Sequence, residues 1–363
     1  MPAEAAAQPV RTQINPDLMN AFMGKFVGDL GAAMNASLVI LGDKVGLYRA
    51  MDAAGAPLTP AELAALTGTN ERYVREWLCA QAAGGYVTYD AASGCFSLTP
   101  EQSFALAQED SPAYIPGAFQ IAASMFNDGE IVADAFRSGE GVGWHQHHAC
   151  LFEGTERFFR PNYAANLIAS WLPALTGVVA KLEAGATVAD VGCGHGASTI
   201  LMAQSFPNSK FFGFDYHQAS IDSARNRAAT ADVPGIEFAV ASAKTFPGSN
   251  YDLVTFFDCL HDMGDPVGAA RHVRQSLAPG GVWMIVEPFA NDALEENLNP
   301  VGQIFYAAST MICTPASRSQ EVGLALGAQA GEKRMRDVVA EAGFTSFRRA
   351  AQTPFNLVYE AMG

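Results

Sequence analysis

The stretch that decides the fold is Val188-Ala189-Asp190-Val191-Gly192-Cys193-Gly194-His195-Gly196. It begins as a short buried strand and turns at three glycines that stand two residues apart. Glycine has no Cβ, so the backbone there can turn tightly and approach a ligand closely. A helical pattern follows through Leu201 to Phe206. A strand, a glycine turn and a helix in this order are typical of a nucleotide-binding α/β unit.

Outward from this turn, strands and helices alternate from residue 185 to the end of the chain. Alternation of this kind predicts a parallel sheet covered on both faces, which is an α/β, Rossmann-like, doubly wound fold. Ligands of such a sheet bind at the carboxyl ends of its strands. The predicted strands lie near 187–191, 210–214, 236–240, 251–256 and 282–287, with two more near Phe347 and Leu357, and the predicted helices lie near 217–229, 266–277 and 334–342.

The glycine turn leaves two classes of cofactor open. With Ala197 it loosely matches the dinucleotide pattern G-x-G-x-x-A, so a nicotinamide cofactor has to be weighed. Asp190 favours S-adenosylmethionine, because this cofactor has no phosphates and carries an amine and a sulfonium that a carboxylate attracts. Asp215 ends the second strand, where a carboxylate accepts hydrogen bonds from both ribose hydroxyls, and it serves either class.

A winged helix is predicted over residues 58–99. Thr59 and Glu62 form a capping box, Asn70 caps the next helix, and two short strands follow. Such a module can bind DNA or act as a scaffold. Its second helix carries two Arg and two Glu between residues 71 and 76, whose charges cancel, and no stripe of Lys or Arg surrounds it. DNA is therefore an unexpected partner.

Composition and charge exclude several classes of protein. The 363 residues are 49% hydrophobic and carry a net charge of −15, which suits a globular protein and argues against nucleic acid as the main partner. Six scattered cysteines without a C-x-x-C pair indicate a reducing, cytoplasmic compartment. The Ala-rich start does not read as a signal peptide, and no apolar run approaches membrane-spanning length. Residues 17–55 still form helices with wide apolar stripes, which need a partner subunit or the rest of the chain as a cover.

Several motifs together resemble class I S-adenosylmethionine-dependent methyltransferases. The matching features are the Asp-x-Gly-x-Gly-x-Gly turn, Asp215 at its strand end, Tyr251-Asp252-Leu253-Val254 and Leu277-Ala278-Pro279-Gly280-Gly281. The winged helix, with Tyr73-Val74-Arg75-Glu76-Trp77-Leu78, resembles the dimerisation domain of the small-molecule O-methyltransferases. A mycobacterial and actinobacterial branch of them is similar at Trp144-His145-Gln146-His147-His148 and at Phe257-Asp258-Cys259-Leu260-His261-Asp262-Met263. The resemblance implies S-adenosyl-L-methionine as cofactor, S-adenosyl-L-homocysteine as product, and a homodimer.

The resemblance also implies which residues hold the cofactor. Asp215 is expected at the ribose and Tyr216 against the adenine. Ser242 stands where the family usually has an acid for the adenine amine, and its neutral hydroxyl makes the weaker bond. Phe257 is expected beside the sulfonium, where an aromatic ring can stabilise the cation. The full implied set is Asp190, Gly192, Gly194, Asp215, Tyr216, Ser242, Ala243, Phe257 and Asp258.

His261 is the candidate general base. It aligns with the catalytic histidine of the His-Asp-Trp segment in plant O-methyltransferases, and Glu287 aligns with a glutamate that orients that base. Methyl transfer to a hydroxyl requires removal of the acceptor's proton, and a histidine pKa near neutrality suits that task. The alternative is a histidine that only shapes the pocket.

A histidine cluster and a long insertion are candidates for the acceptor site. His145 and His148 are expected to contact the substrate, because their segment joins the front half to the cofactor domain. A metal at these histidines is the less favoured alternative, and we expect none. Residues 289–330 interrupt the strand–helix alternation, and insertions of this length are usually functional lids. Phe305 is expected to help cover a flat, apolar acceptor there.

The sequence thus predicts two domains: residues 1–165 for the helical and winged-helix dimerisation domain, and residues 166–363 for cofactor binding. The predicted function is S-adenosylmethionine-dependent methyl transfer to a small, apolar or aromatic molecule, at oxygen and with His261 as the base. Three alternatives stay open. They are a winged-helix transcriptional regulator that senses the cofactor, methyl transfer to nitrogen or sulfur without a base, and an oxidoreductase or non-methylating member of the fold.

Overall fold

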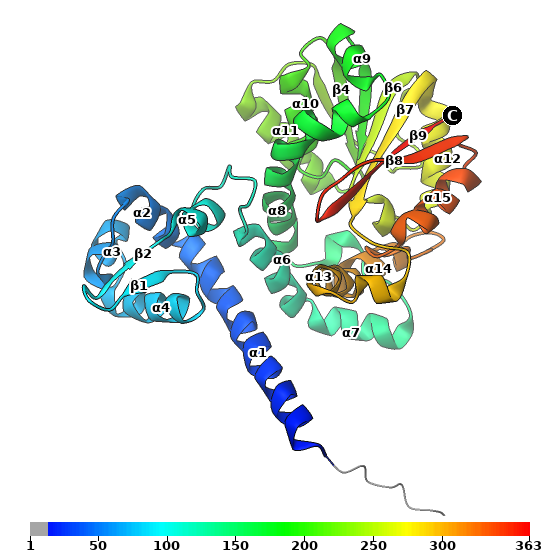
Figure 1. The fold of residues 1–363 in the computed structure, drawn as a ribbon. Coiled ribbons are helices and arrows are strands. Elements are labelled where there is room, and N and C mark those ends of the chain that lie inside the picture. Colours follow the sequence, from blue (N-terminus) through cyan, green and yellow to red (C-terminus); the bar gives the residue numbers. More distant parts are fainter. Residues whose placement is uncertain (1–13) are drawn as a thin grey trace, which may run out of the picture. The chain divides into compact units, whose positions relative to one another are not determined.

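The computed structural model describes residues 14–363 (Figure 1). The chain forms two compact units that divide between Ser103 and Phe104. The Ala-rich start of the chain lies outside the described residues, and with it the prediction about a signal peptide.

The division between the units comes earlier than the domain boundary predicted at residue 165. The helices that follow Phe104 belong to the second unit because they pack onto its other elements: α6 (Pro116–Asn127) lies against α8 (Cys150–Asn166), and α8 contacts α10 (Ala197–Ser205). The aromatic helical stretch after Phe104 is therefore part of the compact unit that holds the sheet.

The first unit contains the winged helix that the sequence predicts. The Thr59 hydroxyl accepts a hydrogen bond from the backbone N–H of Glu62 at 3.3 Å, and the Glu62 carboxylate accepts one from the N–H of Thr59 at 2.8 Å, so the capping box is present. The Asn70 side chain caps the next helix. The elements are α1 (Pro16–Lys44), α2 (Leu47–Ala54), α3 (Pro60–Thr67), α4 (Glu71–Ala83), β1 (Thr88–Asp90) and β2 (Cys95–Ser97), and α5 (Pro100–Leu106) spans the division between the units.

The charges of α4 neutralise one another along the helix. Arg72 pairs with Glu76 at 2.5 Å, and Arg75 pairs with Glu71. Both are four-residue spacings on one helix surface, where opposite charges meet. The helix that would enter a DNA groove therefore offers no unpaired stripe of positive charge to phosphates.

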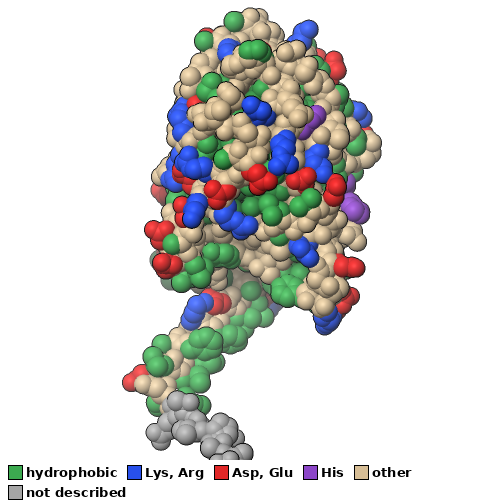
Figure 2. All heavy atoms as spheres, turned by 90° about the vertical axis from the view of Figure 1, so that its right-hand side faces the viewer, with side chains coloured by type: hydrophobic (Ala, Val, Ile, Leu, Met, Phe, Trp, Pro, Cys, Tyr) green, Lys and Arg blue, Asp and Glu red, His purple; other side chains and the backbone are tan. Residues whose placement is uncertain are grey.

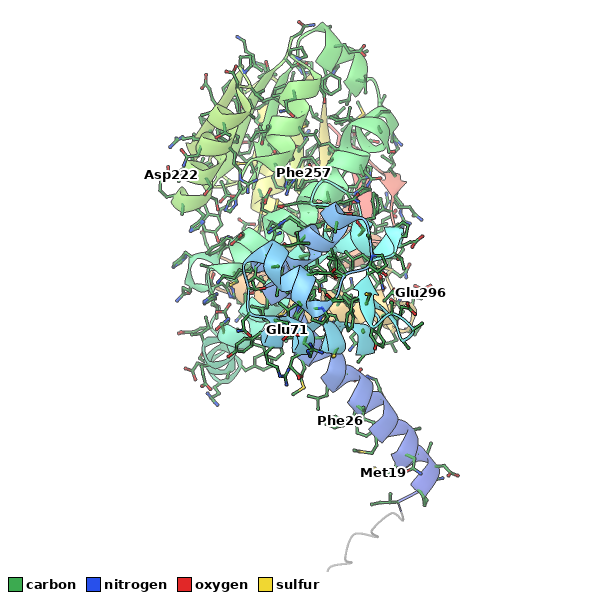
Figure 3. All side chains as sticks on the ribbon, turned by 90° about the vertical axis from the view of Figure 1, so that its left-hand side faces the viewer. Met19, Phe26, Glu71, Asp222, Phe257 and Glu296 are labelled. Atoms are coloured by element: carbon green, nitrogen blue, oxygen red, sulfur yellow. The ribbon has the colours of Figure 1, made fainter. Side chains whose placement is uncertain are left out.

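Apolar side chains gather along α1, as Figures 2 and 3 show. Leu18 is 70% exposed, Phe22 67% and Phe26 47%. By length and composition alone, this 29-residue helix could cross a membrane. The helical segment Cys150–Ala174, joined to the helix Val178–Ala184, passes the same test only as a pair bent by 106°. The prediction that no apolar run approaches membrane-spanning length is therefore wrong for α1, because its 29 residues contain few charged side chains and no charge between Asp29 and Asp43.

The second unit is built on a seven-stranded sheet with the strand order β5-β4-β3-β6-β7-β9-β8. Strands β5, β4, β3, β6 and β7 are parallel, whereas β9 is antiparallel to both β7 and β8. The strands are β3 (Thr187–Val191), β4 (Lys210–Asp215), β5 (Ile236–Val240), β6 (Tyr251–Phe257), β7 (Leu277–Pro288), β8 (Ser346–Gln352) and β9 (Asn356–Met362). The predicted doubly wound fold is confirmed, but the prediction of a parallel sheet is wrong for this last hairpin.

Helices cover both faces of the sheet, because successive strand residues point to opposite sides. Val254 and Phe256 pack on one face beneath α12 (Pro266–Ser276) and α15 (Gly331–Glu341). Leu253 and Phe257 pack on the other face with α9 (Val178–Ala184), α10 and the helical segment before α9. Further elements are α7 (Gly129–Ser138), η1 (Trp144–Gln146), η2 (Leu167–Trp171), η3 (Leu172–Ala174), α11 (Gln218–Ala231) and η4 (Leu260–Asp262).

The insertion predicted at 289–330 is mainly helical. It contains η5 (Leu294–Asn297), α13 (Pro300–Ala308), η6 (Ser309–Cys313) and α14 (Thr314–Arg318). Phe305 and Ile312 pack with Leu151 of α8 in a small apolar cluster of their own. The insertion is thus anchored to α8 by buried side chains and not only by its two ends.

Candidate active site

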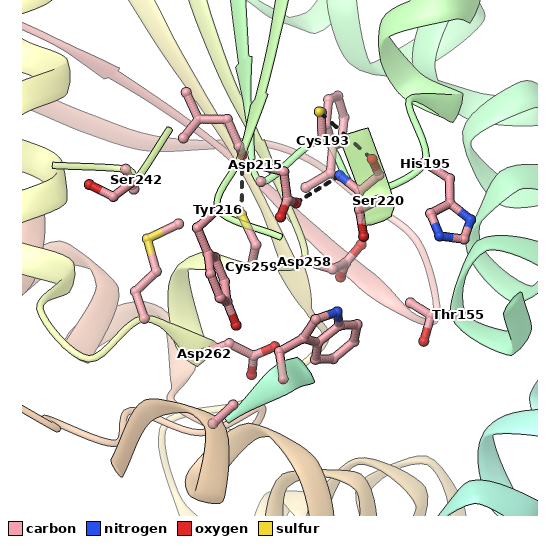
Figure 4. Close-up of a pocket in the computed structure, with 18 of the residues that line it drawn as sticks. Thr155, Cys193, His195, Asp215, Tyr216, Ser220, Ser242, Asp258, Cys259 and Asp262 are labelled. Carbon is pink, nitrogen blue, oxygen red and sulfur yellow. Dashed lines mark hydrogen bonds between the residues drawn. The ribbon is translucent and has the colours of Figure 1, made fainter. Parts of the chain in front are cut away.

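A cavity of about 520 Å³ opens at the carboxyl ends of the parallel strands, where the sequence predicts a ligand (Figure 4). Its walls include the glycine turn after β3, Asp215 and Tyr216 at the end of β4, residues 241–244 after β5 and residues 257–259 at the end of β6. Aromatic side chains of η1 and α8 form another wall, together with residues at α14. All of these elements belong to the second unit.

The glycines of this turn have positive φ angles, and a Cβ added at two of them would clash with neighbouring side chains. Gly192 has φ +74°, and a Cβ added there would meet the Cys259 sulfur at 2.7 Å. Gly196 has φ +78°, and a Cβ there would lie 2.7 Å from the Phe238 ring. Gly194, at φ +51°, has open space beside it. Glycine is therefore required at Gly192 for both conformation and space, at the edge of the cavity.

Asp190 lies behind the glycine turn, not on the cavity wall. It is 1% exposed; Oδ2 accepts hydrogen bonds from the hydroxyls of Ser198 and Thr199, both at 2.6 Å, and Oδ1 accepts one from Thr255 at 3.0 Å. Burial raises the pKa of Asp190, and the three hydroxyls oppose that rise. The carboxylate thus joins the start of α10 to β3 and β6, and its predicted contact with the methionine end of a cofactor stays a prediction.

Asp215 ends β4 with its carboxylate held by two backbone N–H groups. Gly194 donates to Oδ2 at 3.0 Å and His217 donates to Oδ1 at 2.8 Å. Burial raises the pKa of Asp215, and the two N–H groups counteract it. Tyr216, the next residue, is 48% exposed and lines the cavity. The carboxylate is thus oriented at the place where the sequence predicts a ribose.

The turn after β5 lines the part of the cavity predicted to hold an adenine. Ser242 is exposed, and its hydroxyl lies 2.8 Å from that of Thr245. Ala243 lines the wall beside it, next to Lys244. The Lys244 ammonium pairs with Asp265 at 3.2 Å and with Glu321 at 2.6 Å. This lysine therefore closes the end of the cavity as part of an ion-pair network.

The end of β6 brings Phe257 and Asp258 to the middle of the cavity. Asp258 has φ +50°; its Oδ2 accepts a hydrogen bond from the Tyr163 hydroxyl at 3.0 Å, and its Oδ1 accepts one from the Asn356 amide at 2.9 Å. Burial, together with the negative charge of Glu287, raises the pKa of Asp258 to about 8. The Phe257 ring packs 5.2 Å from the Tyr163 ring. Both residues lie where the sequence predicts the sulfonium.

His261 is enclosed between two carboxylates. Its Nδ1 lies 2.5 Å from Oε2 of Glu287, and its Nε2 lies 3.1 Å from Oδ1 of Asp262, an ion-pair distance without standard hydrogen-bond geometry. The backbone N–H of Leu260 donates to the other Glu287 oxygen at 3.0 Å. His261 is 3% exposed and lies behind the cavity wall, whereas Asp262 is on that wall. The predicted pairing of His261 with Glu287 is thus present, but the ring does not face the cavity as a base acting directly would.

Cys313 of η6 completes a compact group of possible metal ligands with His261 and Asp262. One ligand atom from each lies within 4.8 Å of the others. Among the described residues, these three side chains are the ones that lie close enough together to hold an ion.

The residues predicted to contact the substrate lie away from the cavity. His145 and His148 are exposed to solvent, and Phe305 is 7% exposed inside its cluster with α8. Between the two exposed histidines, His147 is buried, with Nδ1 2.9 Å from Asp128. The predictions for His145, His148 and Phe305 therefore do not match the described geometry, since a loop histidine that points to solvent has the same sequence pattern as one that points inward.

The aromatic wall of the cavity was not assigned from the sequence. One face of α8 lines it, and Trp144 of η1 lies beside that face. The lining residues of α8 recur every three or four positions, which is the spacing of one helix face, so this periodicity could have identified them. The α8 residues on the wall are Phe152, Thr155, Glu156, Phe159, Arg160 and Tyr163.

The charges of the wall discriminate between the two cofactor classes. The carboxylates of Asp215 and Asp262 line the cavity. Its Arg and Lys side chains are engaged: Arg160 pairs with Glu156 at 3.0 Å and with Glu109 at 2.9 Å, and Lys244 pairs as described above. A pyrophosphate would meet these carboxylates unfavourably, whereas a cofactor with an amine and a sulfonium would be attracted. The residues present fit S-adenosylmethionine better than a dinucleotide.

Comparison with known proteins agrees with this fold. Residues 182–343 match the family described as a methyltransferase domain, and residues 33–108 match the Rv2258c-like winged HTH domain. Among solved structures, human N-acetylserotonin methyltransferase in complex with SAM is 16% identical, covers 98% of this chain and 100% of its own, and has a TM-score of 0.70. A putative O-methyltransferase from Nostoc punctiforme is 19% identical over 97% of this chain and 100% of its own, with a TM-score of 0.69.

A curated relative is similar over part of the chain. Trans-aconitate 2-methyltransferase of Acidovorax sp. is 34% identical over 102 residues, which are 28% of this chain, and the chain spans 38% of that relative's length. The second unit thus has the class I methyltransferase fold. More particularly, the chain joins this methyltransferase domain to an N-terminal winged HTH domain of the Rv2258c-like family.

Proposed function

We propose that this protein is an S-adenosylmethionine-dependent methyltransferase that methylates an oxygen of a small, apolar or aromatic molecule and releases S-adenosylhomocysteine. One observation carries the proposal. The cavity extends from the glycine turn and Asp215, which suit a nucleoside, to an aromatic wall and Asp262, which suit an acceptor. The matches to a methyltransferase domain and to O-methyltransferase structures support the reaction class.

The cofactor would lie along the ends of β3, β4 and β6. Backbone at Gly192 and Gly194 would contact its methionine part, with Asp190 supporting the turn from behind. Asp215 would accept hydrogen bonds from the ribose hydroxyls, and Tyr216 would cover the adenine.

Three further wall segments complete the proposed cofactor site. Ser242 and Ala243 would border the adenine. Phe257 and Asp258 would lie beside the sulfonium, where a ring face and a carboxylate both favour positive charge. Bound there, the cofactor would supply the electrophilic methyl group.

The acceptor would lie between the sulfonium position and the aromatic wall of η1 and α8. Trp144 and Phe152 offer flat apolar surfaces there, and their rings are 5.5 Å apart. A wall of this kind excludes water and aligns the acceptor oxygen with the methyl group, which accounts for much of the rate in a displacement reaction. The acceptor's proton would leave through the row formed by Glu287, His261 and Asp262.

We further propose that residues 289–330 act as a lid and that the protein is a cytoplasmic homodimer joined through its front half. The exposed apolar side chains of α1 and the matched winged HTH domain support a dimer. The described cysteines are free thiols, as expected in a reducing compartment. The internal charge pairs of α4 favour a scaffold role of the winged helix over DNA binding.

Titration calorimetry of the full chain tests the cofactor assignment. S-adenosylhomocysteine should bind and NAD should not. Asp215→Ala should weaken that binding by about 2 kcal/mol or roughly thirtyfold, because a pair of charge-assisted hydrogen bonds is lost. Asp222→Asn, in an exposed pair with Arg225, is the matched control and should bind as the parent does. Equal affinity of the Ala variant and the parent would refute the site.

A screen for released S-adenosylhomocysteine tests the reaction class. Phenols, alcohols, carboxylates, amines and thiols are offered in separate pools. Turnover confined to amines or thiols would show that the acceptor atom is nitrogen or sulfur and not oxygen. Cofactor binding without turnover in any pool would instead favour a sensor protein over an enzyme.

A further inference from the structure

The end of the cavity that is proposed for the adenine reaches solvent. Ser242 and Lys244 line this end from the turn after β5, and Gln320 and Glu321 line it from the segment after α14. Ser242 is exposed, and the side chain of Glu321 is 79% exposed. Figure 4 shows Ser242 and Thr155 of α8 on opposite sides of the pocket. A ligand that passes through this opening therefore does not have to cross the aromatic wall.

An ion pair crosses the opening. The Lys244 ammonium lies 2.6 Å from the carboxylate of Glu321 and 3.2 Å from that of Asp265. Asp265 is held in place, because its other oxygen accepts a hydrogen bond from the N–H of Gly268 at 2.8 Å and so caps α12. A Cβ added to Gly268 would lie 2.9 Å from the Lys244 side chain, so the glycine leaves room for the lysine stem. Lys244 thus connects the turn after β5 with the start of α12 and with the segment after α14.

The loop that carries Glu321 is held at both of its ends. The Gln320 side-chain oxygen accepts a hydrogen bond from the N–H of Gly264 at 3.1 Å, and the N–H of Leu324 donates to the carbonyl of Gly264 at 2.9 Å. Residues 321–323 form the short loop between these two anchors. A conformational change confined to this loop would therefore move Glu321 while α14 stays in place.

The same loop has a strained backbone. Val322 has φ +74° and is 66% exposed. A β-branched residue is rarely found in this left-handed region, and it keeps such a conformation only when the contacts around it impose it. The pair of Glu321 with Lys244 is the contact that directly precedes Val322 in the chain. Loss of this pair would let the loop relax.

We propose that Lys244 and Glu321 form a gate at the adenine end of the cavity, through which the cofactor enters and S-adenosylhomocysteine leaves. This inference rests on the proposed function. When the pair is formed, the two side chains close the opening. When it breaks, the loop 321–323 relaxes and the long lysine side chain turns into solvent. The helices of the proposed lid do not have to move in this step.

A gate determines rates of exchange and not affinity. The pair joins two side chains of the protein across the opening, so it can form whether the cavity is filled or empty. Its loss should therefore speed the entry and the exit of a ligand by the same factor. A direct contact of Lys244 with the adenine would instead contribute to affinity, and its loss would mainly speed the exit.

Surface plasmon resonance with the full chain measures both rate constants for S-adenosylhomocysteine, and calorimetry measures Kd. Glu321→Gln should raise kon and koff by about two- to fivefold each, as expected for one partly exposed ion pair, and should change Kd by less than about twofold. Raising the salt concentration from about 0.05 M to about 0.5 M should speed exchange in the parent more than in this variant, because salt screens the pair. A double variant, Lys244→Met with Glu321→Gln, should exchange no faster than Lys244→Met alone, since both residues act in one pair.

Two further variants test the loop and the specificity of the effect. Val322→Asn should lower both rate constants, because asparagine adopts a left-handed backbone with less strain than valine and so stabilises the closed loop. Glu341→Gln is the matched control. It removes the same charge from an exposed pair with Arg271, outside the cavity lining, and should exchange as the parent does.

Other outcomes would contradict the gate. Unchanged rate constants in Glu321→Gln would show that the ligand passes elsewhere, and a larger Kd with an unchanged kon would make the pair part of the binding site. Val322→Asn with the rate constants of the parent would exclude the loop as the moving part. Failure of the parent chain to bind S-adenosylhomocysteine in calorimetry would refute the proposed function itself, and that result is read before any rates are compared.

Discussion

Gly192 combines a positive φ with a lack of space, so a single methyl group there should disable the glycine turn. Gly192→Ala should abolish detectable cofactor binding and cost about 2–3 kcal/mol of stability, because a Cβ would meet the Cys259 sulfur and the αL backbone adds about 1–2 kcal/mol of strain. Gly194→Ala is the matched control, since its φ is also positive but its surroundings are open. It should cost only the strain. Calorimetry and urea unfolding measure both variants, and equal losses would contradict the steric argument.

For single residues at the site, the sequence predicted positions better than the directions of side chains. The acids at strand ends were identified because sequence position places them there: Asp215 and Asp258 both line the cavity. The direction of a side chain was harder to predict. The Asp190 carboxylate lies behind the glycine turn and accepts hydrogen bonds from three hydroxyls, and the His145 side chain is exposed to solvent. The Asp190 orientation depends on hydroxyls that α10 and β6 supply, which no local pattern in the sequence reports.

Burial disfavours a charged His261, but Asp262 and Glu287 outweigh it and raise the pKa of the ring well above its ordinary value, which makes a prediction about stability and pH. A group whose folded pKa is raised stabilises the fold fully below its unfolded pKa, about 6.5 for histidine, and loses this contribution as pH rises toward the folded pKa. The free energy of unfolding of the parent should therefore fall by about 1.4 kcal/mol per pH unit above pH 6.5, relative to His261→Gln. Urea unfolding between pH 6 and 8.5 measures the difference. The exposed His145→Gln is the control, and a parallel slope in the parent and His261→Gln would contradict the prediction.

At the scale of elements, the parallel core of the sheet was predictable because each strand is apolar and each is followed by a helix or a turn. The sequence predicted the two strands of the β8–β9 hairpin but not their antiparallel direction. That direction depends on the pairing of β9 with β7, which lies far away in the sequence. The predicted boundary at residue 165 placed α8 with the front half, so the association of α8 with the sheet unit was not predicted. That association depends on α8 contacts with residues far along the chain.

The capping box of α3 gives a test on one element of the winged helix. Thr59→Ala removes the side chain that accepts from the N–H of Glu62 and should lower the stability of the first unit by about 1 kcal/mol. Thr59→Ser keeps the hydroxyl and should behave as the parent. Urea unfolding followed by amide hydrogen exchange within residues 60–83 reports on this unit. Equal stability of the Ala and Ser variants would show that the cap contributes nothing.

On the scale of the whole molecule, the two compact units divide between Ser103 and Phe104, whereas the sequence placed a domain boundary at residue 165. The described residues that line the cavity lie beyond Phe104, in the second unit. In the first unit, the charged side chains of the recognition helix α4 pair with one another. Its long apolar helix is then the feature that most needs a partner.

Light scattering at micromolar concentration should give the mass of a dimer. The exposed side chains of Leu18, Phe22 and Phe26 project from α1, and a stable interface built on such a helix should bury well over about 2,000 Å² in total. Phe22→Glu together with Phe26→Glu should place charges in that interface and produce a monomer that still binds S-adenosylhomocysteine. Phe136→Glu, on the exposed side of α7 in the second unit, is the matched control and should stay dimeric. A monomeric parent would refute the dimer, and a parent that needs detergent to stay in solution would instead assign α1 to a membrane.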